Sequence, residues 1–306
     1  MKKPPVHQPM PTRVPGAGEA KRTSIHPGLF IGIVALLILF ALIVIFTMRE
    51  KKQTLPSDQS KTATRRESEE KTATSIGADN TDSQYGIEMV YVRGGAFMTG
   101  CTTEQGSDCY DYEEQAHQTT VSDFYIGKYE VTQAQWKAVM GNDPSHFKGD
   151  DLPVENVSWD DAQEFIKKLN AATGKAYRLP TGAEWEYAAR GGGQSRGDKY
   201  SGSANVGDVA WYEGNSENKT HPVGTKKANE LGIHDMSGNV WEWVSDLYGN
   251  NGNTPQSAPG SPDGGSFRVI RGGGWGSYAR GVRVSNYYNN GSGNRYNILG
   301  FRLAMS

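Results

Sequence analysis

The hydrophobic pattern of the chain begins with one long, uninterrupted apolar run. Residues 29–48 (LFIGIVALLILFALIVIFTM) carry no charged side chain, and about 20 residues is the length that crosses a ~30 Å hydrocarbon core. No polar face breaks the run, which argues against a buried helix of a soluble protein. The run is also longer than the ~7–15 apolar residues of a signal peptide, and residues 47–50 offer no small-residue cleavage site. We therefore expect a short polar tail at 1–28 and a single transmembrane helix at 29–48.

Residues 49–85 show the opposite pattern, because almost no large apolar side chain occurs there. Lys, Glu, Ser, Thr, Asp and Gln dominate, so the segment cannot bury enough surface to offset the entropy cost of ordering it. We predict a disordered stalk. Aromatic and β-branched residues return from about Gly86, and residues 86–306 are expected to form one domain.

Short strands and short helices alternate within this domain. Residues 87–100 predict a strand, a Gly-Gly turn and a second strand, and residues 124–130 predict another strand. Three helices are expected, at 132–140, 158–172 and 181–190. The last two begin with capping boxes, Ser158 with Asp161 and Thr181 with Glu184. After residue 193 no helical period persists, so the expected fold class is α+β with much irregular chain.

The amino-acid composition excludes some classes of protein. Glycine accounts for 38 of 306 residues, against a usual ~7 %, which suits a loop-rich fold. The chain has 34 acidic and 32 basic residues, and this balance argues against a general nucleic-acid binder. Two cysteines exclude a disulfide-dense scaffold and a four-cysteine zinc site.

Seven motifs occur in order along the domain: MVYVRGGAFMTG (89–100), GKYEVTQAQWKAVM (127–140), PVENVSWDDAQEF (153–165), YRLPTGAEWEYAARGG (177–192), DMSGNVWEW (235–243), RVIRGGGW (268–275) and LGFRLA (299–304). Together they resemble the formylglycine-generating enzyme, or sulfatase-modifying factor, family, over nearly all of 86–306. The resemblance implies an irregular C-type-lectin-like fold that is low in regular secondary structure and often binds calcium.

The same resemblance bears on catalysis. The enzymes of this family oxidise a substrate cysteine to formylglycine, using two cysteines that bind copper just after an RGGSW-like motif; soft sulfur ligands hold Cu(I). Here those two positions fall at about Ser277 and Val282, and neither side chain can ligate copper through sulfur. We expect no copper and no enzyme activity of this kind. A formylglycine-generating or related oxidase remains the alternative.

The resemblance also implies a calcium site in DMSGNVWEW. Asp235 and Glu242 would supply carboxylates, and Gly238 and Val240 would supply backbone carbonyls. Hard oxygen ligands on a tight, glycine-containing loop suit Ca²⁺. The alternative is that this motif is only a turn of the core.

Cys101 and Cys109 frame the short loop CTTEQGSDC. A small loop disulfide is favoured, with two free thiols or a metal or redox pair as alternatives. A disulfide would need an oxidising compartment, which favours export of the C-terminal domain to the periplasm or the cell exterior. Basic residues flank the apolar run on both sides, so the positive-inside rule does not decide the orientation.

Residues 276–298 (GSYARGVRVSNYYNNGSGNRYNI), here called the Tyr/Asn segment, consist mostly of Tyr, Asn, Ser and Gly. Paratopes have this composition, because Tyr gives contact area at low entropy cost while Ser, Gly and Asn adapt their hydrogen bonds. The segment closely resembles the variable region of diversity-generating retroelement target proteins, many of which use the same fold. The positions expected to bind ligand and to vary are Gly276, Ser277, Tyr278, Gly281, Tyr287, Tyr288, Asn289, Asn290, Gly291, Ser292, Tyr296, Asn297 and Ile298.

Interspersed positions of the segment are expected to be fixed framework: Arg280, Arg283, Val284, Ser285, Asn294 and Arg295. The function expected from the sequence is a membrane-anchored, non-catalytic display protein with a protein or cell-surface ligand. A fixed structural component of an envelope complex is a further alternative, as is an ordinary Gly/Asn-rich loop in a non-catalytic relative.

Overall fold

The computed structural model describes residues 82–113, 115–248 and 267–306. The expected polar tail, the expected transmembrane helix at 29–48 and most of the expected stalk lie outside these residues. Within the described ranges, no helix is long and apolar enough to cross a membrane.

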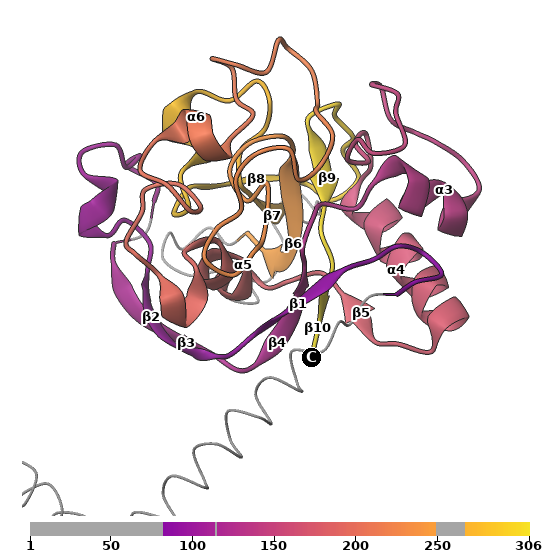
Figure 1. Cartoon of the computed structure of the whole chain (residues 1–306), viewed down its shortest axis with the longest axis horizontal. Helices are drawn as coiled ribbons and strands as arrows, with labels where there is room; N and C mark the ends of the chain where they lie inside the picture. The colour runs from indigo at the N-terminus through magenta and orange to yellow at the C-terminus, as the bar shows by residue number, and fades with distance from the viewer. Residues whose placement is uncertain (1–81, 114, 249–266) are drawn as a thin grey trace, which may run out of the picture. The chain divides into compact units, whose positions relative to one another are not determined.

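Strands of the described residues form three sheets (Figure 1). The first has the order β1-β4-β10-β5 and consists of β1 (Met89–Val92), β4 (Phe124–Gly127), β10 (Ala304–Met305) and β5 (Tyr177–Arg178). The second pairs β2 (Gly95–Thr99) with β3 (His117–Val121). The third has the order β8-β7-β6-β9 and consists of β8 (Tyr287–Gly291), β7 (Phe267–Arg271), β6 (Trp241–Leu247) and β9 (Leu299–Phe301). In the third sheet β6 and β9 run parallel, whereas β6–β7 and β7–β8 are antiparallel.

The three expected helices are confirmed as α3 (Gln133–Met140), α4 (Trp159–Thr173) and α5 (Gly182–Ala189). Each begins at a capping box, with Thr132, Ser158 and Thr181 as the N-cap residues. The structure adds α6 (Val206–Val209) and the 3₁₀ turns η1 (Thr103–Gln105), η2 (Gly192–Gln194) and η3 (Ala279–Val282). These pieces are too short to leave a helical period in the sequence. The fold is mixed helix and sheet, as expected.

The Gly-Gly turn between the first two strands does not close a hairpin. β1 pairs with β4 and β2 pairs with β3, so the chain crosses from one sheet to another at Gly94. A Cβ on Gly94 would lie 2.4 Å from the carbonyl carbon of Ser122. Glycine is therefore needed at this position for close backbone approach.

The folded domain also starts earlier than residue 86. Asp82 bridges to Ile87 and is only 8 % exposed. Its carboxylate lies 3.6 Å from the Lys175 amine and accepts a 3.4 Å hydrogen bond from the Tyr177 hydroxyl. The last residues of the expected stalk thus belong to the domain, because partners far along the chain bury them.

Two apolar clusters make up most of the core. In the first, Trp136 of α3 stacks on Phe165 of α4 with ring centroids 5.4 Å apart, and Phe301 of β9 meets both rings edge-on. The second surrounds Trp185 of α5 and includes Val244 of β6 and Val284. Figure 1 shows α3 and α4 on one side of the central strands and the β2–β3 ribbon on the other.

A buried ion pair lies at the centre of the domain. The Arg302 guanidinium donates two 2.6 Å hydrogen bonds to the Glu242 carboxylate, and both side chains are fully buried. Arg302 also donates to the carbonyls of Gly127 and His234, each at 3.0 Å. The Trp185 indole donates to Glu242 at 2.7 Å. The Arg302–Glu242 pair therefore joins β4, β6, α5 and the turn at residue 234.

Candidate ligand-binding face

The Tyr/Asn segment leaves β7, passes through η3, forms the outer strand β8 and returns to β9. Three of its tyrosines are strongly exposed: Tyr278 at 72 %, Tyr288 at 54 % and Tyr296 at 49 %. Contiguous exposed aromatic surface marks interaction sites. We call these three exposed tyrosines, with the segment that carries them, the tyrosine face.

The other expected ligand positions differ in exposure. Gly276 is exposed. The partly buried positions are Ser277, Tyr287, Asn289, Asn290, Gly291, Ser292, Asn297 and Ile298. Each of these residues keeps part of its surface exposed to solvent.

Gly281 was expected to contact ligand, which stays a prediction, and it differs from the other expected positions in being buried. Gly281 is buried in η3, and its carbonyl accepts a 2.7 Å hydrogen bond from the Asn286 amide. A Cβ on Gly273 would lie 2.7 Å from the same carbonyl oxygen. The composition of the segment does not reveal that this position is buried in a 3₁₀ turn.

Buried Arg283 fixes the middle of the segment. Its guanidinium pairs with both oxygens of Glu113, and the Ser285 hydroxyl donates to the same carboxylate at 2.8 Å. Its Nε donates to the Arg280 carbonyl at 2.8 Å. Arg283 and Glu113 are both fully buried in this pair. A side chain from the N-terminal part of the domain thus holds the segment in place.

Residues outside the segment bond to its middle and to its C-terminal end. Arg271 of β7 donates to the carbonyls of Ser285 and Asn286, at 3.1 and 3.4 Å. The Trp275 indole donates to the Asn297 carbonyl at 2.9 Å, and the Asn156 backbone N–H donates to the Tyr296 carbonyl at 2.9 Å. None of these bonds uses a side chain expected to vary. The backbone of the face is therefore held independently of its exposed side chains.

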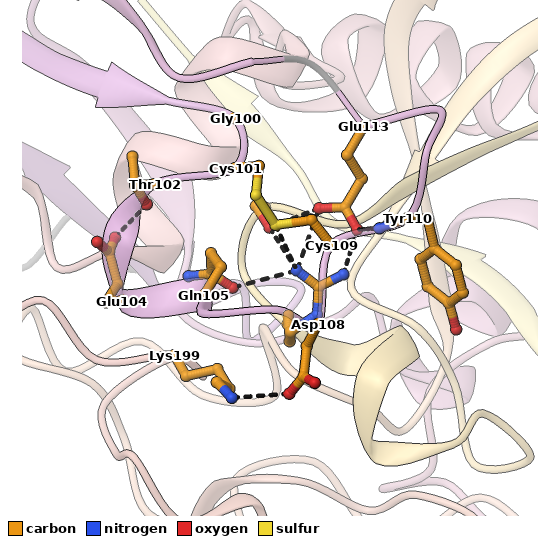
Figure 2. The surroundings of a disulfide bond; sticks show 12 residues. Gly100, Cys101, Thr102, Glu104, Gln105, Asp108, Cys109, Tyr110, Glu113 and Lys199 are labelled. Carbon is orange, nitrogen blue, oxygen red and sulfur yellow. Dashed lines mark hydrogen bonds and ion pairs between the residues drawn. A yellow bond between two sulfur atoms is a disulfide. The ribbon is translucent and has the colours of Figure 1, made fainter.

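The cysteine loop lies directly against the segment (Figure 2). The structure joins Cys101 and Cys109 in a disulfide, with Cα atoms 6.0 Å apart. Asp108 pairs with Lys199 at 2.8 Å, and this hydrogen bond lowers the pKa of the Asp108 carboxyl. Arg280 donates to the carbonyls of Asp108 and Cys109. The loop and the segment therefore form one connected surface.

Sequence reasoning missed the residues that follow this loop. Tyr110 and Tyr112 contact the segment, and Glu113 holds Arg283. The available signal was the run YDYEE directly after Cys109, in which two tyrosines alternate with acids. Nothing local connects this run to a partner 170 residues away.

The expected calcium ligands fit a metal ion only in part. Asp235 is buried, burial raises its pKa to about 6, and its Oδ1 has no hydrogen-bond partner. Both Glu242 oxygens, however, bind Arg302. Among the residues that the structure describes, no three His, Cys, Asp or Glu side chains are grouped as metal ligands. Calcium binding through Asp235, Gly238, Val240 and Glu242 stays a prediction, and it would require Arg302 to release Glu242.

The two positions aligned with copper cysteines have other roles. The Ser277 hydroxyl accepts a 3.0 Å hydrogen bond from the Gly274 N–H. Val282 is fully buried against Tyr200, Val209 and Ala210. This part of the domain offers no thiolate.

Glu155 precedes Asn156 and gives a pH-dependent prediction. It is buried, accepts a 2.8 Å hydrogen bond from the Phe147 N–H, and leaves its second oxygen without a partner. Burial raises its pKa to about 7. The folded state therefore holds this proton more tightly than the unfolded state, whose Glu pKa is about 4.3. The stabilisation is complete below that value and is lost as the pH rises to about 7.

Glu155→Gln is consequently expected to stabilise the domain, relative to the original protein, more at pH 8 than at pH 5. The difference between the two gains should be on the order of 2 kcal/mol, since each pKa unit corresponds to about 1.4 kcal/mol. Urea unfolding of both proteins at both pH values measures it. An equal effect at pH 5 and pH 8 would show that Glu155 ionises normally in the folded state.

Residues 76–306 match the sulfatase-modifying factor enzyme 1-like domain, or FGE-sulfatase, family. The chain belongs to this family. The solved structure of Treponema denticola variable protein 1 superimposes with a TM-score of 0.62 at 35 % identity, covering 72 % of this chain and 95 % of that one. The predicted resemblance to the family and to variable proteins is thus confirmed.

Two further proteins, with different names, are similar to this chain. Chaperone protein LppX of Paenibacillus barcinonensis is 39 % identical over 248 residues, which are 65 % of this chain and 82 % of that protein. Formylglycine-generating enzyme of Streptomyces coelicolor is 35 % identical over 195 residues, 57 % of this chain and 59 % of the enzyme. The relatives of this chain therefore include proteins named as enzymes and proteins that are not.

Proposed function

We propose that this protein is a membrane-anchored, non-catalytic binding protein that presents the tyrosine face to a protein or cell-surface ligand. One observation carries the proposal: Tyr278, Tyr288 and Tyr296 are exposed on a backbone that other, buried residues hold in place. A rigid backbone with exposed tyrosines loses little entropy on binding. Likeness to Treponema denticola variable protein 1 supports the same reading.

The proposal that the domain is non-catalytic rests on the copper positions. Ser277 and buried Val282 replace the two cysteines that the enzymes of the family use. We expect no oxidation of a cysteine-containing peptide when copper and oxygen are supplied. Measured turnover would instead favour an oxidase.

Residues 29–48 would anchor the protein, and residues 49–81 would hold the domain away from the bilayer. A flexible coil of that length spans roughly 35 Å. The Cys101–Cys109 disulfide favours an exported domain. Protease added to intact cells is expected to release the domain, and its protection would reverse the orientation.

Replacing Tyr278, Tyr288 and Tyr296 with alanine is expected to abolish binding while changing stability little. Exposed aromatic side chains commonly dominate binding energy, whereas surface substitutions usually change stability by less than ~0.5 kcal/mol each. Because the ligand is unidentified, the probe is a 12-residue random peptide library on phage, selected on the full-length chain in lipid nanodiscs. Selected clones should lose about 100-fold or more in affinity for the triple variant.

Met98→Ala is the matched control, because Met98 is 47 % exposed on β2 and lies outside the face. Clones should bind this variant like the original. If the triple variant unfolds, the tyrosines belong to the core and the proposal fails. If its affinity for the clones is unchanged, the face is not the binding site.

Diversification of the face is a separate part of the proposal. Long-read sequencing of the gene and its flanks from sibling cells tests it. A near-copy of the coding segment for 276–298 beside a reverse transcriptase, with changes confined to adenine positions, is the expected result. A segment that is constant between cells and lacks a template would leave a fixed binding or structural role.

A further inference from the structure

One tyrosine outside the Tyr/Asn segment lies at its edge. Tyr112 is 39 % exposed, and its ring meets those of Tyr287 and Tyr288 edge-on at 5.9 and 6.2 Å between centroids. The Tyr112 ring also stacks on the Tyr110 ring, with centroids 5.1 Å apart and an interplanar angle of 7°. The Arg280 guanidinium lies 3.8 Å from the Tyr110 ring centre. We call Tyr110, Tyr112 and Tyr288 the tyrosine cluster.

Hydrogen bonds hold the Tyr112 ring in this position. Its hydroxyl donates to the Asn286 side chain at 3.1 Å, and its carbonyl accepts a 2.6 Å hydrogen bond from the Tyr287 hydroxyl. The next residue, Glu113, is anchored on buried Arg283. The disulfide closes the loop that precedes Tyr110 (Figure 2). An aromatic ring held at both ends is presented with little freedom left to lose on binding.

We infer that the binding face extends beyond the Tyr/Asn segment, that Tyr112 is a fixed ligand-contacting residue, and that the Cys101–Cys109 disulfide positions it. The partner contacting this part of the face is a protein that inserts an uncharged side chain, aliphatic or proline, against the tyrosine cluster. This inference rests on the proposed function.

The chemistry of the cluster favours a protein over a polyanion or a sugar. Arg280 lies over the Tyr110 ring and donates to the carbonyls of Asp108 and Cys109, so these donors are already engaged within the protein. Exposed Asp111 adds a negative charge beside the cluster. Binding of a polyanion requires cations that are free to contact phosphate or sulfate.

A sugar ring would need polar partners beside the aromatic surface. The hydroxyls of Tyr112 and Tyr287 are both committed to the protein's own acceptors. What Tyr112 offers is carbon surface. Burying an apolar side chain against it adds contact without leaving a polar group unpaired.

In a diversified face, Tyr112 and the variable positions of the Tyr/Asn segment would have different roles. Tyr112 belongs to a part of the chain that the segment's variation would not reach, so every version of the face would keep it. The constant ring would supply a shared anchor, and the surrounding positions would set the partner.

The test uses the peptide-display clones selected on the full-length chain in nanodiscs. Their affinities are measured for Tyr112→Ala, Tyr112→Phe, Tyr288→Ala and the control Met98→Ala. We expect a loss of about tenfold or more with Tyr112→Ala and Tyr288→Ala, and none with Met98→Ala. Tyr112→Phe keeps the ring and should remain within about threefold, which separates ring contact from a folding defect. Selected peptides should be rich in aliphatic residues and proline.

The outcomes separate the two proposals. Clones that lose binding with Tyr288→Ala but not with Tyr112→Ala would overturn the inference and leave the proposed function standing. Clones that respond neither to these two variants nor to the triple variant of Tyr278, Tyr288 and Tyr296 would overturn both. Loss with Tyr112→Phe equal to that with Tyr112→Ala would assign the effect to the hydroxyl, and it would contradict a contact through the ring.

The disulfide and the partner class are tested in parallel. Cys101→Ser combined with Cys109→Ser should weaken the same clones by about tenfold, because the loop would have to be ordered on binding. Unchanged affinity would show that the disulfide does not position Tyr112. A neutral-glycan array tests the partner class. If the original chain binds a glycan, loses that binding with Tyr112→Ala and selects no peptide, the partner is a carbohydrate and not a protein.

Discussion

Replacing Arg302 with methionine is expected to lower the free energy of unfolding by about 3–5 kcal/mol. The substitution leaves the Glu242 carboxylate fully buried and without its counter-charge. It also removes donors from the carbonyls of Gly127 and His234. Against a total of about 5–15 kcal/mol for a typical domain, this variant should be marginally folded. Urea unfolding followed by tryptophan fluorescence measures the loss.

Two further variants make the result specific. Arg295→Met is the matched control, because Arg295 pairs with Asp161 at 2.6 Å but is 51 % exposed, and an exposed pair contributes at most about 1 kcal/mol. Combining Arg302→Met with Glu242→Gln should recover a large part of the loss, since no unpaired charge remains and Trp185 keeps an acceptor. If Arg302→Met costs no more than Arg295→Met, the central ion pair contributes little.

The helices could be predicted because their signals are local. Thr132, Ser158 and Thr181 each bond to a backbone N–H three residues ahead, so the cap and its partner are adjacent in the sequence. Glycine at the end of α4 adopts a φ of 70°, which also follows from the residue itself. Such features need no knowledge of the tertiary fold.

Pairings across the chain could not be predicted, because their partners share no local pattern. Glu242 and Arg302 are 60 residues apart, and Glu113 and Arg283 are 170 apart. The one hint for the first pair is an arginine inside the apolar motif LGFRLA, where an exposed charge would not be expected. Burial of a charge implies a partner, but the sequence does not say which.

Some features of the tyrosine face could likewise be predicted from the sequence, and others could not. Composition was enough to expect exposed tyrosines, and Tyr278, Tyr288 and Tyr296 are exposed. It could not separate these from Tyr287, whose hydroxyl bonds to the Tyr112 carbonyl. That distinction depends on the cysteine loop, which reaches the segment only in the folded domain.

Replacing Arg283 with methionine is the second substitution with a large expected effect, about 3 kcal/mol or more on the free energy of unfolding. Glu113 would remain buried with only the Ser285 hydroxyl and the Tyr110 N–H as donors. The loss of stability should be largest in the two parts of the chain that Arg283 joins. Hydrogen exchange should therefore rise most in residues 101–113 and 279–291.

The control for this prediction lies in the same segment. Arg280 is exposed and rests on Tyr110, so Arg280→Met should change stability by no more than about 1 kcal/mol. With Arg283→Met, amides of the two regions around the pair should exchange at least about tenfold faster, while α4 amides follow the global stability alone. A uniform increase across the domain would mean that Arg283 stabilises the fold as a whole. An increase confined to the two regions would mean that this arginine joins the cysteine loop to the Tyr/Asn segment, and that the tyrosine face depends on it.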